Sequence, residues 1–275
     1  MNEDTNMAAI IRDMLSFCLN VRWRSADRLG QERFTTVSRH YPIFGPVLSA
    51  AACALSCAAG NLVFRICGYR LLSTAWMIFV FYLIRGIRLF DGFCDMSEGL
   101  SYARQRGAET AWDVIHSHSN GAFAILWALI LMLGQFSTGA WLVSMPLAEG
   151  ILPAFACGAL SAAGIVFCHT KKTKYNPGSA FLPFLSFCDT GKQIRAAVVS
   201  GCCTLPLLLC SNSAVWFHLL IFVLLIMTTI LSSRFLGWLI MHELKGFNGD
   251  VFGFVSLAQY VLLLSLYEVL YGVVR

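Results

Sequence analysis

Three carboxylates lie close together in the sequence at a spacing that suits the binding of a metal ion. Asp91, Asp95 and Glu98 stand at positions i, i+4 and i+7, so in a helix they fall within an arc of about 60° on one face. Because like charges at this spacing repel one another, we expect a cation to compensate them. Mg²⁺ prefers oxygen ligands and commonly bridges carboxylates to substrate phosphates. The alternative interpretation is an ordinary solvated loop.

Basic residues flank this acidic segment. Arg85 and Arg88 precede it, Arg104 and Arg106 follow it, and three lysines lie within residues 171–174. Carboxylates, Mg²⁺ and cationic side chains in one site are typical of reactions at a diphosphate, where catalysis depends on positioning and on neutralising charge. We therefore expect Arg85 and Arg88 to bind and neutralise the substrate. The lysines suit anionic lipid headgroups equally well.

A second acidic segment, residues 245–253, contains three glycines around one carboxylate. Glycine permits close approach of the backbone to a ligand, and the helix expected to follow presents its N-terminal amides to a phosphate. We therefore expect Gly249 to contact the substrate and Asp250 to take part in the reaction. The alternative is that Asp250 simply caps the following helix.

The elements that must position these residues are membrane helices. Of the 275 residues, 57% are hydrophobic and 13% are charged, and the mean hydropathy is +0.68. A water-facing globular protein needs far more polar surface, and a disordered chain or a small disulfide scaffold differs in composition. We predict an all-α polytopic integral membrane protein with about seven transmembrane helices, near residues 43–60, 71–90, 121–136, 147–168, 196–210, 214–231 and 251–273.

The whole chain, residues 1–275, is predicted to form a single membrane domain. Residues 1–42 form a cytoplasmic or interfacial segment, in which residues 10–21 suit an amphipathic helix at the membrane surface. Residues 43–273 form the transmembrane helices and the active-site loops between them. Of the 20 Lys and Arg residues, 17 fall in segments that would share one side of the membrane. Because cytoplasmic loops are enriched in these residues, we place the N-terminus and the active-site loops in the cytoplasm, at the inner (plasma) membrane.

Four short motifs resemble those of a known family and occur in the same order. Residues 89–99 resemble the family pattern H-L-D-G-L-A-D-T-x-D-G, and residues 121–124 are similar to G-A-F-G. Residues 245–253 resemble G-G-x-T-G-D-x-x-G, and residues 41–45 resemble F-P-L-V-G. The family is that of cobalamin synthases, the adenosylcobinamide-GDP ribazoletransferases. The chain departs from it by Leu89 for the family's His, Glu98 for its third Asp, and Ser117 for the Asp of a K-D-S stretch.

The resemblance implies a membrane-bound, Mg²⁺-dependent transferase that joins adenosylcobinamide-GDP to α-ribazole, or to its 5′-phosphate, and releases GMP. It implies that Asp91, Asp95 and Glu98 hold Mg²⁺ and the diphosphate, and that Asp250 is a further metal ligand or the base for the hydroxyl proton. Catalysis and substrate binding then fall on Asp91, Asp95, Asp250, Arg85, Arg88, Gly92, Gly99 and Gly249. The expected partners are the two substrates and the lipid bilayer, without nucleic acid, and a homo-oligomer is left open.

Two other interpretations stay open. A CDP-alcohol phosphotransferase also carries an acidic, glycine-containing motif at a membrane face, but its longer signature needs an acidic residue two turns after Gly99, where Arg106 and Gly107 stand. A small transporter would explain seven spans, but its binding site is expected near the middle of the bilayer. In a proton-coupled carrier the central acid would be Glu268, inside the last predicted span.

Overall fold

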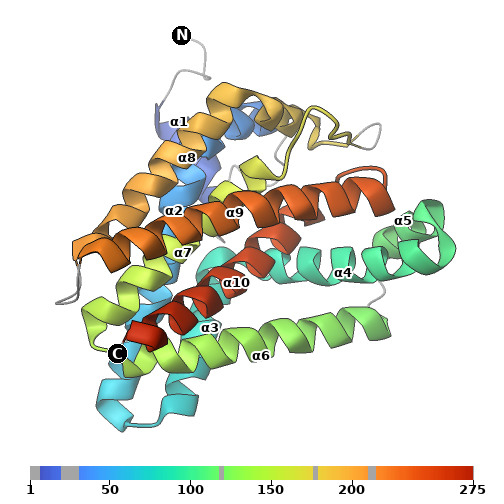
Figure 1. Cartoon of the computed structure of the whole chain (residues 1–275). Coiled ribbons are helices and arrows are strands. Elements are labelled where there is room, and N and C mark those ends of the chain that lie inside the picture. Colours follow the sequence, from blue (N-terminus) through green and yellow to red (C-terminus); the bar gives the residue numbers. More distant parts are fainter. Residues whose placement is uncertain (1–6, 20–30, 118–120, 176–178, 210–214, 275) are drawn as a thin grey trace.

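The computed structural model describes residues 7–19, 31–117, 121–175, 179–209 and 215–274 (Figure 1). Within these ranges every regular element is a helix, and an isolated β-bridge joins Tyr175 to Phe247. The α-helices are α1 (Met7–Cys18), α2 (Gln31–Cys67), α3 (Arg70–Arg85), α4 (Arg88–Arg106), α5 (Ala108–His116), α6 (Ala122–Ser144), α7 (Leu147–Phe167), α8 (Thr190–Thr204), α9 (Val215–Glu243) and α10 (Asp250–Val274). The 3₁₀ helices are η2 (Leu182–Cys188) and η3 (Leu205–Leu209). The prediction of an all-α chain is confirmed.

In the described part of the chain, five helices are long and apolar enough to cross a membrane. They are Phe34–Cys67 of α2, α6, α7, His218–Glu243 of α9 and Asp250–Val273 of α10. These helices contain the predicted spans 43–60, 121–136, 147–168, 214–231 and 251–273 almost completely. The predicted number of about seven spans is not confirmed.

The two remaining predicted spans, 71–90 and 196–210, fall on shorter helices. α3 has 16 residues, which at about 1.5 Å per residue is less than the hydrocarbon core of about 30 Å. It ends where Gly86 adopts a φ of 86°, a conformation that glycine tolerates. α8 has 15 residues, begins with the charged turns around Lys192 and Arg195, and gives way to η3. Pro206 lies in η3 and cannot donate the hydrogen bond that an α-helix requires.

Helix α7 is the most buried of the five long helices and forms the centre of the bundle. Its small residues permit close helix contacts, as is common inside membranes. A Cβ on Gly158 would lie 2.9 Å from the carbonyl oxygen of Ser49 in α2, and a Cβ on Gly164 would collide with the side chain of Gln259 in α10. α7 therefore fixes the positions of α2 and α10.

The crossing of α4 and α10 also depends on glycines, which have no side chain at the contact (Figure 1). A Cβ on Gly253 of α10 would collide with the carbonyl oxygen of Leu89, and a Cβ on Gly92 of α4 would lie 3.0 Å from the Cα of Asp250. The first turn of α10 is thereby held against the first turns of α4. This crossing brings the two acidic motifs of the sequence together.

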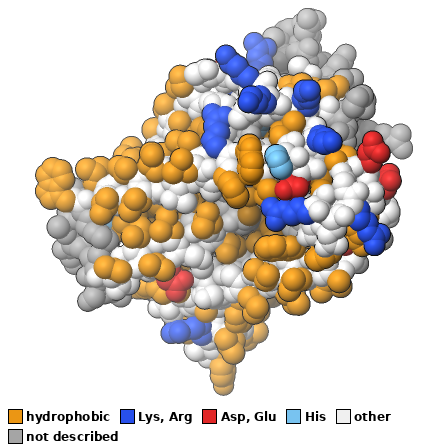
Figure 2. Space-filling model, turned by 45° about the vertical axis from the view of Figure 1, so that its right-hand side comes forward, with side chains coloured by type: hydrophobic (Ala, Val, Ile, Leu, Met, Phe, Trp, Pro, Cys, Tyr) orange, Lys and Arg blue, Asp and Glu red, His pale blue; other side chains and the backbone are white. Residues whose placement is uncertain are grey.

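The outer surface of the protein carries hydrophobic and charged areas. Large apolar side chains are exposed on α3, α6 and α9, including Trp76, Leu133 and Trp238. Figure 2 shows a face on which hydrophobic side chains cover much of the left and lower parts, while most of the charged side chains gather at the upper right. Exposed apolar areas of this extent suit contact with lipid rather than water, and the protein is a membrane protein.

Candidate active site

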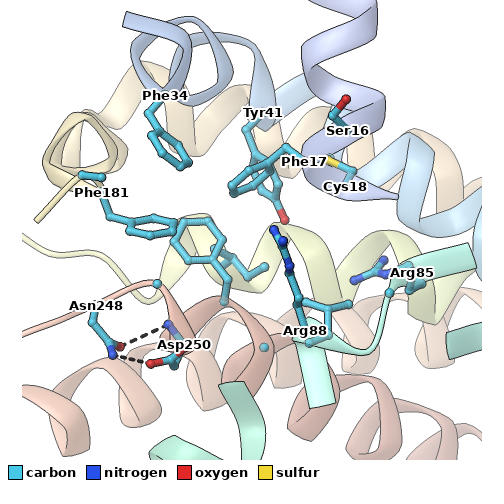
Figure 3. A pocket seen from close by; sticks show the side chains of 18 of the residues that line it. Ser16, Phe17, Cys18, Phe34, Tyr41, Arg85, Arg88, Phe181, Asn248 and Asp250 are labelled. Atoms are coloured by element: carbon cyan, nitrogen blue, oxygen red, sulfur yellow. Dashed lines mark hydrogen bonds between the residues drawn. The ribbon is translucent and has the colours of Figure 1, made fainter. Parts of the chain in front are cut away.

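A cavity of about 520 Å³ lies where several distant segments of the chain meet (Figure 3). Its lining comes from the end of α1, the first half of α2, the junction of α3 and α4, residues 179–181 and the start of α10. Small-molecule sites commonly have volumes of about 300–1,000 Å³. Four of the predicted site residues line the cavity, namely Arg85, Arg88, Gly249 and Asp250.

Arg85, the last residue of α3, is a buried cation in the cavity lining. Its side chain donates to the hydroxyl of Ser49 and, over 2.9 Å, to that of Ser256, while its Nε is buried without a hydrogen-bond partner. Only 8% of Arg85 is exposed, and no carboxylate among the described residues forms an ion pair with it. Because an uncompensated buried charge is costly, this arrangement favours an anionic ligand.

Arg88, the first residue of α4, brings a second positive charge to the cavity. Its side chain extends into the cavity toward the hydroxyl end of Tyr41 (Figure 3). The helix breaks at Gly86, which lies between the two arginines. Arg85 therefore reaches the cavity from the end of α3, and Arg88 reaches it from the start of α4. Two guanidinium groups with fixed donor geometry suit the recognition of phosphate oxygens.

Asp250 begins α10 on the opposite side of the cavity from α1. Its Oδ2 accepts a hydrogen bond from Nδ2 of Asn248, and its backbone N–H donates over 3.2 Å to Oδ1 of the same residue. This reciprocal pair orients the carboxylate at the helix N-terminus (Figure 3). A neighbouring residue, Gly249, leaves space for an aromatic ring, because a Cβ there would lie 2.5 Å from the ring of Phe181.

The loop before Asp250 is anchored at both ends. Nε1 of Trp112 in α5 donates to the carbonyl oxygen of Leu244 over 2.8 Å, and the N–H of Phe247 donates to the carbonyl oxygen of Lys174 over 2.8 Å. Lys245 between them adopts a positive φ of 57°. The position of Asp250 therefore depends on contacts with two other parts of the chain.

His169, just beyond α7, holds the segment that pairs with this loop. Its Nδ1 lies 2.8 Å from the carbonyl oxygen of Ile165 and therefore carries the proton, while its Nε2 accepts from the hydroxyl of Tyr175 over 2.8 Å. Burial lowers the pKa of His169 to about 4, because a charged imidazolium is costly away from water. The neutral ring thus fixes Tyr175, which forms the β-bridge to Phe247, and the carbonyl oxygen of the adjacent Lys174 accepts the N–H of Phe247.

The three predicted metal-binding carboxylates of α4 lie in different surroundings. Asp91 is exposed and Asp95 is buried. The carboxylate of Glu98 is buried and accepts the backbone N–H of Ala124 in the first turn of α6. Glu98 therefore caps the N-terminus of α6, where a negative charge is favourable. None of the three lines the cavity, and no three acidic, His or Cys side chains gather as a metal site among the described residues.

Two of the glycines predicted to contact the substrate have packing roles in the structure. Gly92 touches the backbone of Asp250, and Gly99 lies against the side chain of Ile115 in α5. Neither residue lines the cavity. Of the predicted substrate contacts, Arg85, Arg88 and Gly249 line the cavity together with Asp250. Gly92 and Gly99 lie instead at contacts of α4 with α10 and with α5.

Several lining residues could not be identified by spacing alone. Asn248 lies inside the glycine-containing motif, and its position two residues before Asp250 is the one feature of the sequence that points to a role beside this carboxylate. Phe17, Phe34 and Phe181 also line the cavity, but they come from distant segments with no common motif. Only the folded chain brings these three rings together.

Comparisons with known proteins add one finding. The family model of cobalamin-5-phosphate synthase matches residues 11–267, a range that contains all of the predicted site residues. No curated protein and no solved structure matches the chain. The family match confirms the resemblance to cobalamin synthases that the four sequence motifs indicate.

Proposed function

Because the chain belongs to the cobalamin-5-phosphate synthase family, we propose that it joins adenosylcobinamide-GDP to α-ribazole, or to its 5′-phosphate. The family match makes the protein a membrane transferase of cobalamin nucleotide-loop synthesis. The products of the proposed reaction are adenosylcobalamin, or its 5′-phosphate, and GMP. We further propose that the enzyme lies in the plasma membrane with its N-terminus and its active-site loops in the cytoplasm, as the distribution of Lys and Arg indicates.

The observation that carries this proposal is the buried Arg85, without an ion-pair partner among the described residues, in a cavity that also contains Arg88 and Asp250. The diphosphate of adenosylcobinamide-GDP is an anion that would compensate both guanidinium groups. Arginine at such a site both orients the phosphates and neutralises the charge that develops on the leaving group. The cavity thereby offers what a phosphoryl transfer requires from the protein.

In the proposed reaction a ribose hydroxyl of α-ribazole attacks the cobinamide-linked phosphorus. A new P–O bond forms, the bond from that phosphorus to the bridging oxygen breaks, and GMP leaves with the electron pair. We assign Asp250 as the base that takes the hydroxyl proton, because its carboxylate lines the cavity and is oriented by Asn248. Arg85 and Arg88 bind the diphosphate and hold its phosphorus in line for the attack.

The acidic donors of α4 suit a cation that has few protein ligands. Asp91 and Asp95 flank Gly92, the residue of α4 that touches the backbone of Asp250, so oxygen donors lie on both helices near this contact. Mg²⁺ keeps several waters and takes phosphate oxygens of the substrate as ligands. We propose that Asp91 and Asp95 would hold Mg²⁺, which would neutralise charge on the diphosphate when bound.

Turnover by the purified protein in lipid nanodiscs tests the proposed function. With adenosylcobinamide-GDP, α-ribazole and Mg²⁺, the protein should release GMP and form a cobamide in equal amounts. Asp250→Asn should lower the rate by about 10²–10⁴-fold, the usual contribution of a general base, whereas Glu109→Gln, an exposed acid on α5, should leave it unchanged. A folded protein without product would reject the reaction, and full activity of Asp250→Asn would reject the assigned base.

A further inference from the structure

Three aromatic rings form one wall of the cavity. Phe17 lies at the end of α1, Phe34 near the start of α2, and Phe181 just before η2. The ring centroids of Phe34 and Phe181 are 4.9 Å apart, and those of Phe17 and Phe34 are 6.2 Å apart. Figure 3 shows Phe34 and Phe181 next to each other above Asn248 and Asp250. We call Phe17, Phe34 and Phe181 the aromatic wall.

The aromatic wall differs from the packed aromatic core behind it. Phe184 and Phe187 are 0% exposed, whereas the three rings of the aromatic wall are only partly buried and line the cavity. Gly249 is needed for this arrangement, since a Cβ at that position would lie 2.5 Å from the ring of Phe181. The glycine therefore allows an aromatic face to lie beside the start of α10.

Cationic groups belong to the same cavity as the aromatic wall. Arg88 extends into the space beneath Tyr41, and Arg85 contributes its buried guanidinium group (Figure 3). A ligand that contacts both the rings and the arginines must combine a flat apolar part with an anionic part. A nucleotide has these two parts, because its base has two π-faces and its phosphate is negatively charged.

Resting on the function proposed above, we infer that the aromatic wall binds the heteroaromatic base of a nucleotide substrate while Arg85 and Arg88 bind its phosphate. Stacking on aromatic side chains tolerates different bases, because every base presents a π-face. Guanine of adenosylcobinamide-GDP and the base of α-ribazole 5′-phosphate share this chemistry. The aromatic wall therefore determines binding of the base, and the arginines determine binding of the phosphate.

Equilibrium binding to the protein in nanodiscs, without turnover, tests this division. The probes are GMP and α-ribazole 5′-phosphate, each compared with ribose 5-phosphate, which has the sugar and the phosphate but no base. At least one nucleotide should bind the wild type about tenfold more tightly than ribose 5-phosphate, within the range expected for stacking of one base. The nucleotide that shows the preference identifies which base the wall holds.

Variants separate the two parts of the subsite. Phe181→Leu and Phe34→Leu keep an apolar side chain but remove the ring, so they should reduce the preference for the nucleotide about fivefold or more and leave binding of ribose 5-phosphate unchanged. Arg88→Gln should weaken the binding of all three probes by a similar factor. Phe235→Leu, on the exposed surface of α9, is the matched control and should change nothing.

Two results would overturn the inference. One is equal binding of ribose 5-phosphate and both nucleotides to the wild type. The other is an unchanged preference for the nucleotide in folded Phe181→Leu and Phe34→Leu proteins. Because these measurements need no catalysis, they test the base subsite independently of the proposed reaction. If the protein releases no GMP but still prefers the nucleotide in a way that depends on the rings, the reaction is rejected and the base subsite is supported.

Discussion

Replacement of Glu98 distinguishes a helix cap from a metal ligand. The carboxylate belongs to a residue that is 3% exposed, and its Oε2 accepts the N–H of Ala124 while its Oε1 faces Gly121 at the start of α6. Glu98→Gln keeps one oxygen acceptor in a side chain of nearly the same shape, removes the charge and replaces the other oxygen with an amide NH₂ group. Glu98→Ala removes the acceptor as well and leaves a void.

General values for helix caps set the expected size of the two effects. Loss of a helix N-cap costs about 0.5–2 kcal/mol, and a negative charge near a helix N-terminus contributes about 0.3–1 kcal/mol, or up to about 2 kcal/mol where it is partly buried. We expect Glu98→Gln to lower the free energy of unfolding by about 1 kcal/mol, the part due to charge. Glu98→Ala should lower it by about 3 kcal/mol, because the amide of Ala124 also loses its buried acceptor.

Two measurements on the same purified variants check this assignment. Denaturant titration in detergent micelles gives the free energies of unfolding, and titration of turnover with Mg²⁺ gives the metal requirement. A capping role predicts graded losses of stability and, for Glu98→Gln, the same Mg²⁺ requirement as the wild type. A Glu98→Gln protein that is as stable as the wild type but needs much more Mg²⁺ would refute the reasoning and identify Glu98 as a metal ligand.

The other predictions concern the loop and the helix crossing that position Asp250. Burial lowers the pKa of His169 to about 4 in the folded chain, so between pH 6.5 and 4 the unfolded chain takes up a proton there that the folded chain excludes. Over this range the free energy of unfolding should therefore drop by about 3 kcal/mol more in the wild type than in His169→Gln. Denaturant titrations at a series of pH values measure this, and an equal change in the free energy of unfolding with pH in both proteins would contradict the prediction. Gly253→Ala places a Cβ against Leu89 and should cost about 1–3 kcal/mol and most of the turnover, whereas the control Gly272→Ala, with open space around it, should behave as the wild type.

The membrane helices could be predicted from the sequence because long apolar runs are a local property. The same local signal does not show where a helix ends, so two of the predicted spans, 71–90 and 196–210, are not confirmed. Gly86 stops α3 after 16 residues, and α8 is short and polar in its first turns before Pro206. The helix ends are therefore set by single residues, Gly86 after α3 and Pro206 after α8, which the average hydropathy of a segment does not reveal.

The candidate site could be predicted in part for a related reason. Helical spacing correctly gives the angular positions of Asp91, Asp95 and Glu98, but seven residues also extend about 10 Å along the helix axis. α4 is buried through residues 92–100, so side chains two turns apart meet different neighbours. Glu98 consequently reaches α6, while the first turn of α4 meets α10. Spacing within one helix does not contain this information.

The central claim is that the cavity around Arg85 binds the diphosphate of the substrate. Equilibrium binding of adenosylcobinamide-GDP to the wild type and to Arg85→Gln in nanodiscs tests it most directly. Glutamine can still donate to Ser49 or Ser256, so the fold should persist while the charge is lost. We predict about 10–100-fold weaker binding by the variant, as expected for loss of charge-assisted hydrogen bonds of about 1.5–3 kcal/mol. Equal binding by the two folded proteins would contradict the claim.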